Sequence, residues 1–482
     1  MRSPKTIGLT FSAICCLAAS APADEPVRYL AFQIFTGELN STLLQQAFPP
    51  HSIDLRTAVL DLRDRIGTVG TKDRRLGFVL GPIAFDNSDE DVRKLIAAGF
   101  YFALKTGVAI GFHLDDSMFW GRLKELNAPE SVEWLDWQGT LNTGRRLDWS
   151  SKPMKIMPQL CLNSRAVKDA VAARALLVGG EIAKGIKKLE AATKDDLFLG
   201  VIAGWETQIG RDYETGKYLG YRALTNAGYS ARNPPADIDG ALGEITREFV
   251  GFWAGSLIAA GVPGNKVYSH FAYMSSTMYE LAKRAKPADF SAPYLRTINF
   301  TPPAVAFCER GLPGFSTYPQ PGHLEQWREE LNKHGNPGWA STEGTAIDPG
   351  EAEHSGMGME MEGYLGNLFN HGAVLVNLFG WGVGDDSNPF RKIAESKGAL
   401  AAYRKFLTGE TLHEAPIPVP VIPPADLPDK IHKIQANLPG WIKKNGPAQV
   451  KDNLEQLDKA IKEKRWDKAE QVAAAILQTI EK

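Results

Sequence analysis

The chain has 482 residues, of which 44% are hydrophobic and 23% charged, and this is the composition of an ordinary globular protein. The length suffices for a large α/β domain with an appendage. The formal net charge of −2 shows no basic excess, so we expect neither a nucleic acid nor an anionic membrane surface as a partner.

The N-terminal segment predicts export. A basic head, "MRSPK", precedes the apolar run "TIGLTFSAICCLAAS", and "APA" follows as a cleavage site of small residues. This order is typical of a secretory signal peptide, which we expect over residues 1–23, and the run is too short for a transmembrane anchor. No other apolar run is long enough to span a membrane. We therefore expect a secreted or periplasmic protein.

Eight short apolar runs follow along the chain, and each predicts a buried strand. They cover residues 28–37, 75–85, 108–116, 197–206, 266–274, 313–319, 337–346 and 373–382. Amphipathic helical patterns lie between them. This alternation predicts a (β/α)8 TIM barrel, which we place at residues 24–412. An open doubly wound sheet is the competing arrangement, but no G-x-G-x-x-G follows the first strand to support its nucleotide-binding form.

Two long loops are expected after the third and fourth strands, over residues 117–165 and 208–237. Both are rich in aromatic residues, namely Trp120, Trp134, Trp137, Trp149, Tyr213, Tyr218, Tyr221 and Tyr229. Loops at this end of a barrel surround the active site. Because aromatic rings stack on the C–H faces of sugars, the loops predict a wall over a carbohydrate site. The alternative is that these rings only pack the loops.

The C-terminal part differs from the barrel in composition. Residues 413–428 are rich in proline and predict a stiff linker. Residues 429–482 are charged, with apolar positions at helical spacing, and predict a helical hairpin or a three-helix unit. This unit holds no catalytic constellation, so we expect it to contact a protein or the cell envelope.

Two glutamates close predicted strands of the barrel. Glu206 ends the fourth strand in "LFLGVIAGWE", and Glu343 ends the seventh in "PGWASTE". The ends of these strands face each other across the mouth of an eight-stranded barrel. Two carboxyl groups there can flank one scissile bond. Glycoside hydrolysis uses such a pair, one as the acid that protonates the leaving oxygen and one as the carboxylate that attacks C1 or activates water.

This arrangement resembles the clan of (β/α)8 glycoside hydrolases with the acid/base on strand four and the nucleophile on strand seven. The resemblance implies these two roles for Glu206 and Glu343. It also implies a tyrosine after strand six that hydrogen-bonds the nucleophile, which is Tyr318, and an aromatic floor of the sugar site after strand eight, which is Trp381. The chain has Trp205 where the clan usually has an asparagine, and this indicates a divergent family.

Other polar strand ends are expected to bind substrate together with Trp205, Tyr318 and Trp381. They are His113, Asp115, Asp116, His270 and Tyr273. Two alternatives stay open, that the aspartates cap the following turn and that His270 is a structural hydrogen-bonding group. Glu309 rivals Glu343 if the strand assignment slips. Asp385 and Asp386, after the last strand, are interpreted as structural.

The remaining chemical signals are weak. The chain has no G-x-S-x-G elbow, no P-loop and no cluster at metal-ligand spacing, so we expect no cofactor. Cys161 and Cys308 could pair in an oxidising compartment, and two buried free thiols fit equally well.

The sequence therefore predicts a secreted glycoside hydrolase that acts on a poly- or oligosaccharide, with retention and endo-action favoured. We expect Glu206 to hold a proton and Glu343 to be ionised, helped by a hydrogen bond from Tyr318 or His270. The gap between the carboxyl groups decides between retention and inversion. A transglycosylase that remodels an envelope polysaccharide is one alternative. A non-catalytic carbohydrate-binding protein on a barrel scaffold is the other.

Overall fold

The computed structural model describes residues 26–35, 54–115, 117–147, 154–215, 217–271, 275, 302–320, 322–346, 360–416, 426–462 and 465–481. The predicted signal peptide lies outside these residues. So do Trp149, Asp116, Tyr273 and most of the predicted linker.

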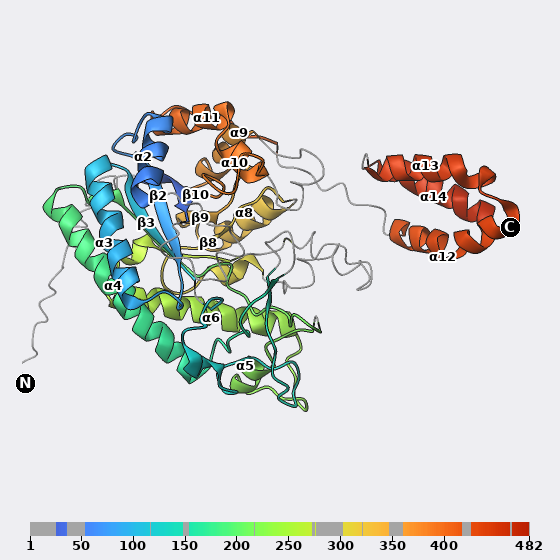
Figure 1. Ribbon diagram of the computed structural model, residues 1–482, viewed down its shortest axis with the longest axis horizontal. Coiled ribbons are helices and arrows are strands. Elements are labelled where there is room, and N and C mark those ends of the chain that lie inside the picture. The colour runs from blue at the N-terminus through green and yellow to red at the C-terminus, as the bar shows by residue number, and fades with distance from the viewer. Residues whose placement is uncertain are drawn as a thin grey trace, which may run out of the picture.

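Eight parallel strands form the centre of the fold (Figure 1). In chain order they are β1 (Arg28–Ile34), β2 (Arg74–Ile83), β3 (Ala109–Leu114), β6 (Phe198–Ala203), β7 (Val267–Ser269), β8 (Gly314–Ser316), β9 (Trp339–Glu343) and β10 (Ala373–Leu378). Their order in the sheet is β7-β6-β3-β2-β1-β10-β9-β8. Each strand thus pairs with its neighbour in sequence, and β10 returns to β1. All eight predicted strands are present.

The two ends of this sheet meet, which closes the barrel. Parallel bridges join Tyr268 to Leu312 and Phe271 to Phe315. The backbone N–H of Ser269 donates to the carbonyl of Leu312 at 3.0 Å. The predicted (β/α)8 barrel is therefore confirmed, and the open doubly wound sheet is excluded.

Helices cover the outside of the barrel (Figure 1). They are α2 (Leu55–Ile66), α3 (Asp89–Thr106), α4 (Arg165–Ala191), α5 (Tyr221–Asn226), α6 (Ile238–Ala259), α8 (His323–Lys333), α9 (Met361–Phe369), α10 (Pro389–Ala394) and α11 (Lys397–Leu407). Local sequence sets several of their ends. The side chain of Ser88 caps the N-terminus of α3, and Gly107 ends that helix with a φ of 74°, a conformation that glycine adopts without strain.

Side chains fill the lower interior of the barrel, so it is a core and not a channel. Leu199 on β6 lies against β2 and β3, and a Cβ atom added to Gly77 would come within 2.5 Å of Leu199 Cδ2. A Cβ atom on Gly111 would come within 2.2 Å of Leu199 Cδ1. Two glycines on neighbouring strands thus make room for the side chain of Leu199 in the barrel interior.

The long loops after β3 and β6 are confirmed, and they pack against each other. The first carries a short hairpin, β4 (Arg146–Leu147) with β5 (Met154–Lys155). The N–H of Tyr213 in the second loop donates to the carbonyl of Gly144 in the first at 2.8 Å. The rings of Trp137 and Tyr221 meet edge to face with their centroids 5.1 Å apart. These two rings therefore contribute to packing between the loops.

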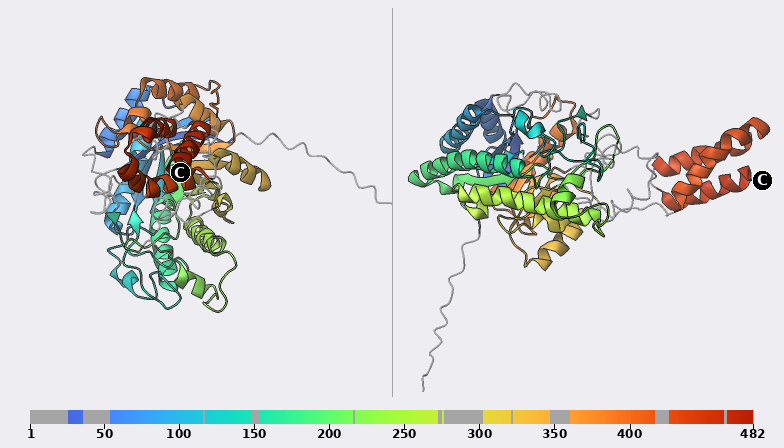
Figure 2. Two further views of the ribbon diagram at one scale, coloured as in Figure 1. Left: turned by 90° about the vertical axis from the view of Figure 1, so that its right-hand side faces the viewer. Right: turned by 90° about the horizontal axis from the view of Figure 1, so that it is seen from below.

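The C-terminal helices are α12 (Leu427–Asn445), α13 (Ala448–Lys462) and α14 (Trp466–Ile480). Both views of Figure 2 show them packed on one another, and α14 contacts both α12 and α13. Buried residues such as Leu457, Val472 and Ile476 give these helices a hydrophobic core of their own. Of the two predicted forms, the structure has the three-helix unit.

Cys161 and Cys308 are free thiols and do not pair. Cys161 is buried in the loop after β3, and Cys308 donates a hydrogen bond to the carbonyl of Arg310. None of the described helices combines the length and the apolar character that crossing a bilayer requires.

Candidate active site

Glu206 lies in a tight turn directly after β6. Gly204 has a φ of 99° and Glu206 a φ of 50°, and the second value is uncommon for a residue with a side chain. The N–H of Thr207 donates to the carbonyl of His270, which ties this turn to the end of β7. Oε1 of Glu206 accepts a hydrogen bond from Ser316 Oγ at 2.8 Å. Strained backbone of this kind is concentrated at functional sites.

Glu343 is the last residue of β9 and is only 7% exposed. Its Oε1 accepts a hydrogen bond from the Tyr318 hydroxyl at 2.9 Å, and its Oε2 accepts one from Trp205 Nε1 at 3.1 Å. Trp205 is the residue before Glu206 in the chain. The residue before Glu206 thus bonds Glu343, and the two glutamates lie at the carboxyl ends of β6 and β9.

Burial, and after it the negative charge of Glu206, raise the pKa of Glu343 to about 8, although the hydrogen bonds from Tyr318 and Trp205 act in the opposite direction. Two carboxyl groups that repel each other in a buried site titrate as a pair and retain a proton that an isolated carboxyl would lose. An ionised Glu343 at neutral pH, as expected from the sequence, therefore requires that Glu206 holds the shared proton.

A layer of buried polar side chains lies beneath the two glutamates. It consists of Gln33, His113, His270 and Asn377, each at most 1% exposed. His113 on β3 contacts both Gln33 on β1 and His270 after β7, at 3.0 and 2.9 Å. These strands are not neighbours in the sheet, so the contacts cross the barrel interior. The predicted role of His113 and His270 in binding substrate does not fit this burial, and the structural alternative for His270 does.

An apolar cluster, which we call the mouth cluster, surrounds Trp205 at the carboxyl end of the barrel. Its buried members are Phe35, Ala84, Met118, Phe119, Ile156, Trp205, Phe379 and Val383. Most of them follow the end of a barrel strand. The cluster excludes water from one side of the glutamate pair, and this lowers the local dielectric and strengthens the interaction between the two charges.

Trp381 does not lie in the mouth cluster, which corrects a prediction. Its ring packs against Phe32 with the centroids 5.1 Å apart, and the guanidinium of Arg65 lies 4.6 Å from its centre. Phe32 also contacts Tyr403 of α11, so these side chains face the outer helices. Alternation alone would place Asn377, Phe379 and Trp381 on one face, but the chain turns after β10 at Gly380, whose φ is 117°, and this turn explains the error.

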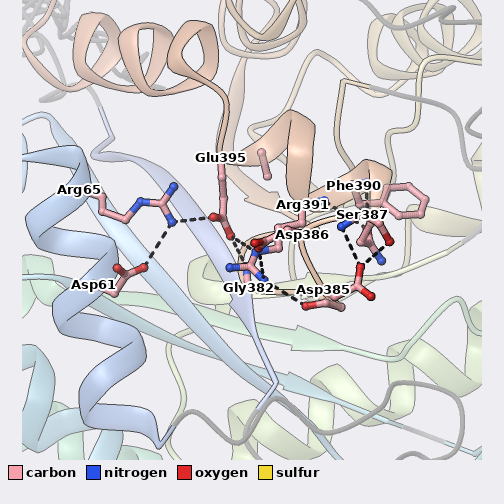
Figure 3. Close-up of polar contacts among 12 residues, drawn as sticks. Asp61, Arg65, Gly382, Asp385, Asp386, Ser387, Phe390, Arg391 and Glu395 are labelled. Atoms are coloured by element: carbon pink, nitrogen blue, oxygen red, sulfur yellow. Dashed lines mark hydrogen bonds and ion pairs between the residues drawn. The ribbon is translucent and has the colours of Figure 1, made fainter.

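A polar network holds the loop after β10 in place (Figure 3). The carboxylate of Glu395 accepts hydrogen bonds from Arg65, Arg391 and the N–H of Gly382. Asp385 accepts from the N–H of Ser387. Asp386 forms an ion pair with Arg391. Asp385 and Asp386 thus take the structural part predicted for them.

The remaining candidates lie apart from the glutamate pair. Asp115 is buried, and its carboxylate accepts hydrogen bonds from the N–H groups of Met118 and Phe119. It therefore caps the following turn, as the alternative proposed, and does not fit the predicted role in binding a sugar. Glu309 is exposed before β8 and does not rival Glu343.

Several residues of this site were missed in the sequence, namely Ser316, Gln33, Asn377 and Phe379. Gln33 and Asn377 carry a readable signal, since each is a lone polar residue inside an apolar strand. Ser316 carries none, because a serine at a strand end is common. Among the described residues no group of three or more histidine, cysteine or acidic side chains is arranged to hold a metal ion.

No family model and no curated protein matches the chain. Solved structures similar to it include a cold-adapted β-galactosidase from Rahnella sp. R3, with 10% identity over 80% of this chain and a TM-score of 0.39. A GH42 β-galactosidase from G. stearothermophilus has 10% identity over 81% of the chain and a TM-score of 0.40. D-psicose 3-epimerase has 9% identity and a TM-score of 0.34, and the match covers 80% of this chain and 100% of the epimerase. The chain spans 57% and 58% of the lengths of the two β-galactosidases.

Proposed function

We propose that this protein is a secreted glycoside hydrolase that uses Glu206 as acid/base and Glu343 as nucleophile. One observation carries the proposal. Two carboxyl groups follow the fourth strand and end the seventh strand of a closed barrel; Trp205 and Tyr318 donate to Glu343, and Ser316 donates to Glu206. Glycosidic bond cleavage requires such a pair.

Hydrogen bonding assigns the two roles. Both oxygens of Glu343 accept, one from the Tyr318 hydroxyl and one from the indole N–H of Trp205. An indole can only donate, so this environment favours the ionised form of Glu343. Glu206 faces the hydroxyl of Ser316, which can donate or accept. In the proposed mechanism Glu206 therefore holds the shared proton, which is the form that a general acid needs.

The two steps of the reaction follow from these roles. Glu206 transfers its proton to the glycosidic oxygen while an oxygen of Glu343 attacks C1, so that the sugar becomes bound to Glu343 and the leaving group departs as an alcohol. Glu206, now a carboxylate, takes a proton from water, and the resulting hydroxide displaces Glu343 from C1. Retention is proposed, which requires a gap of about 5–5.5 Å between the carboxyl groups, whereas inverting enzymes need roughly 6.5–9.5 Å.

The substrate is proposed to be a neutral poly- or oligosaccharide cut internally. The two long loops after β3 and β6 are rich in aromatic residues, and such rings stack on the C–H faces of sugars. The test is release of reducing ends across a broad panel of neutral and charged glycans, with the anomer of the first product read by NMR. A neutral glycan cut with retention supports the proposal. No cleavage of any glycan, with binding of one of them, would favour the carbohydrate-binding alternative.

Replacing Tyr318 by phenylalanine is expected to lower kcat/KM by roughly 10- to 100-fold, the value of one hydrogen bond to a charged group. The hydroxyl favours the ionised form of Glu343, so its loss raises the pKa of that carboxyl further. The acid limb of the pH–rate profile should therefore move to higher pH.

The matched control is Tyr403→Phe. Tyr403 is also a buried tyrosine, but its hydroxyl donates to the carbonyl of Ala394 in the outer helices. The Tyr403→Phe substitution should therefore leave the pH–rate profile unchanged. An acid limb that stays in place for Tyr318→Phe would contradict the part assigned to this hydroxyl.

A further inference from the structure

Glu206 is one end of a chain of four polar contacts that runs into the barrel. Ser316 Oγ lies 2.8 Å from Glu206 Oε1 and 2.8 Å from His270 Nε2. His270 Nδ1 lies 2.9 Å from His113 Nε2, and His113 Nδ1 lies 3.0 Å from Gln33 Oε1. All but Glu206 are buried. We call these five residues the relay.

The far end of the relay has fixed donors and acceptors. Asn377 Nδ2 faces the carbonyl of Thr342 at 2.8 Å, so this nitrogen donates, and it also donates to Gln33 Oε1 at 3.0 Å. Gln33 Nε2 faces the carbonyl of Gly81 at 3.2 Å and donates there. The atom of Gln33 that faces His113 Nδ1 is therefore an oxygen, which requires a hydrogen on Nδ1.

With both histidines neutral and Glu206 ionised, the relay has one hydrogen fewer than its contacts need. Each of the four contacts needs one hydrogen to be a hydrogen bond, and the carbonyl of Gly204, 3.0 Å from His113 Nε2, is bonded only when that nitrogen also carries a hydrogen. Neutral His113, neutral His270 and Ser316 supply one each, which makes three. A fourth comes from a protonated Glu206 or from a second hydrogen on His113. With Glu206 ionised and both histidines neutral, one buried contact has no hydrogen, and such a contact is costly.

We propose that the relay is a proton store for Glu206, in which Ser316 and the two histidines act as positioning residues and the five residues together hold one proton more than they would with Glu206 ionised and both histidines neutral. This rests on the proposed function in so far as Glu206 is the acid/base. The proton has two places. Either Glu206 is a carboxylic acid and every other member is neutral, or Glu206 is a carboxylate and His113 is an imidazolium.

The two forms interconvert by a shift of three hydrogens. The hydrogen on His113 Nε2 moves to His270 Nδ1, the one on His270 Nε2 moves to Ser316 Oγ, and the hydroxyl hydrogen of Ser316 moves to Glu206 Oε1. Three bonds to hydrogen break and three form. The positive charge of His113 and the negative charge of Glu206 disappear together, and no other reactant is needed.

The surroundings of the relay favour the proton on Glu206 in some respects and on His113 in others. Burial lowers the pKa of His113 to about 3, which favours the neutral histidine and places the proton on Glu206. The carbonyl of Gly204, 3.0 Å from His113 Nε2, favours a hydrogen on that nitrogen and acts in the opposite sense. The other titratable groups that face Glu206 are Glu343 and Tyr318. The charge of Glu343 repels a carboxylate at Glu206, so it also favours the proton there.

The relay predicts that ionisation of Glu206 changes the tautomer of His270. When the extra proton leaves at high pH, the Ser316 hydroxyl turns its hydrogen to the carboxylate, and His270 must donate to Ser316 from Nε2. His270 therefore changes from a hydrogen on Nδ1 to a hydrogen on Nε2. His113 keeps its hydrogen on Nδ1 because Gln33 requires it.

The test is a pH titration of the ¹⁵N-histidine-labelled full chain by NMR, from about pH 4 to about pH 10, because the nitrogen shifts distinguish the two tautomers and the imidazolium. The nitrogens of His270 are identified with a His270→Asn sample. We expect them to exchange character with one midpoint. No substrate is present, so a chain that cuts no glycan still gives a clear result.

Three variants are compared with the wild type. In Ser316→Ala the relay is cut, so His270 should keep one tautomer at every pH. Glu206→Gln tests the same link from the other end, since its amide supplies the fourth hydrogen permanently, and His270 should again keep one tautomer. Ser341→Ala removes a buried hydroxyl that bonds Thr317 outside the relay, and the exchange should persist. A His270 that keeps one tautomer in the wild type, or that still exchanges in Ser316→Ala or Glu206→Gln, overturns the proposal.

Discussion

Replacing Glu343 by glutamine is expected to lower kcat/KM for glycan cleavage by at least roughly 10³-fold, because the amide cannot attack C1 and the covalent intermediate does not form. The substitution keeps the size of the side chain, and the amide can accept from Trp205 Nε1 through its oxygen and donate to the Tyr318 hydroxyl through its NH2. The variant should therefore fold, and the rate of reducing-end release with the glycan that the wild type cuts is the measurement.

The matched control for this variant is Glu330→Gln. Glu330 is also mostly buried, but it lies on α8, where it binds Lys333 and His334. Its replacement should leave the rate within about twofold, since ion pairs of this kind contribute little. Full activity of Glu343→Gln would remove Glu343 from the mechanism and leave the carbohydrate-binding alternative or another nucleophile to be considered.

Replacing Glu206 by glutamine is expected to lower the rate by roughly 10²–10⁴-fold on natural glycans, which is the range of general acid catalysis. The loss should depend on the leaving group. An alkoxide leaves only when it is protonated, whereas an activated phenolate leaves without help. Aryl glycosides of low leaving-group pKa should therefore be cleaved to the covalent intermediate almost as fast as by the wild type.

The measurement is a comparison of pre-steady-state release of an activated phenol with steady-state cleavage of the glycan. A burst of phenol followed by slow turnover identifies Glu206 as the acid/base, because the second step also lacks its base. An equal loss for good and poor leaving groups would contradict this role. It would indicate that Glu206 only orients the substrate or Glu343.

The barrel was predictable because its signals are local. Each buried strand is a short apolar run and each surface helix an apolar stripe, and these periods follow from the backbone geometry of one segment at a time. Since the carboxyl ends of all parallel strands meet at one end of a barrel, the strand count also placed Glu206 and Glu343 at the same mouth. The hydrogen bond from Tyr318 to Glu343 was implied by the resemblance to the glycoside hydrolase clan.

The errors have a common cause in side-chain direction. Trp381 and Phe379 both follow β10 and are two residues apart, so a continued strand would give them the same face. The turn at Gly380, with a φ of 117°, instead leaves Phe379 in the mouth and packs Trp381 on Phe32 and Arg65. The role of Asp115 could not be decided from the sequence either, because only the folded loop shows that its carboxylate accepts hydrogen bonds from the N–H groups of Met118 and Phe119.

The sequence by itself thus determined which residues form strands and helices, and that two glutamates share one end of a closed barrel. Tertiary structure alone decided what each polar side chain contacts. Gln33 and His270 are more than 200 residues apart in the chain, yet both reach His113 inside the barrel. The physical reason is that local periodicity specifies the direction of the backbone, whereas donors and acceptors across the barrel meet only when all eight strands have closed around them.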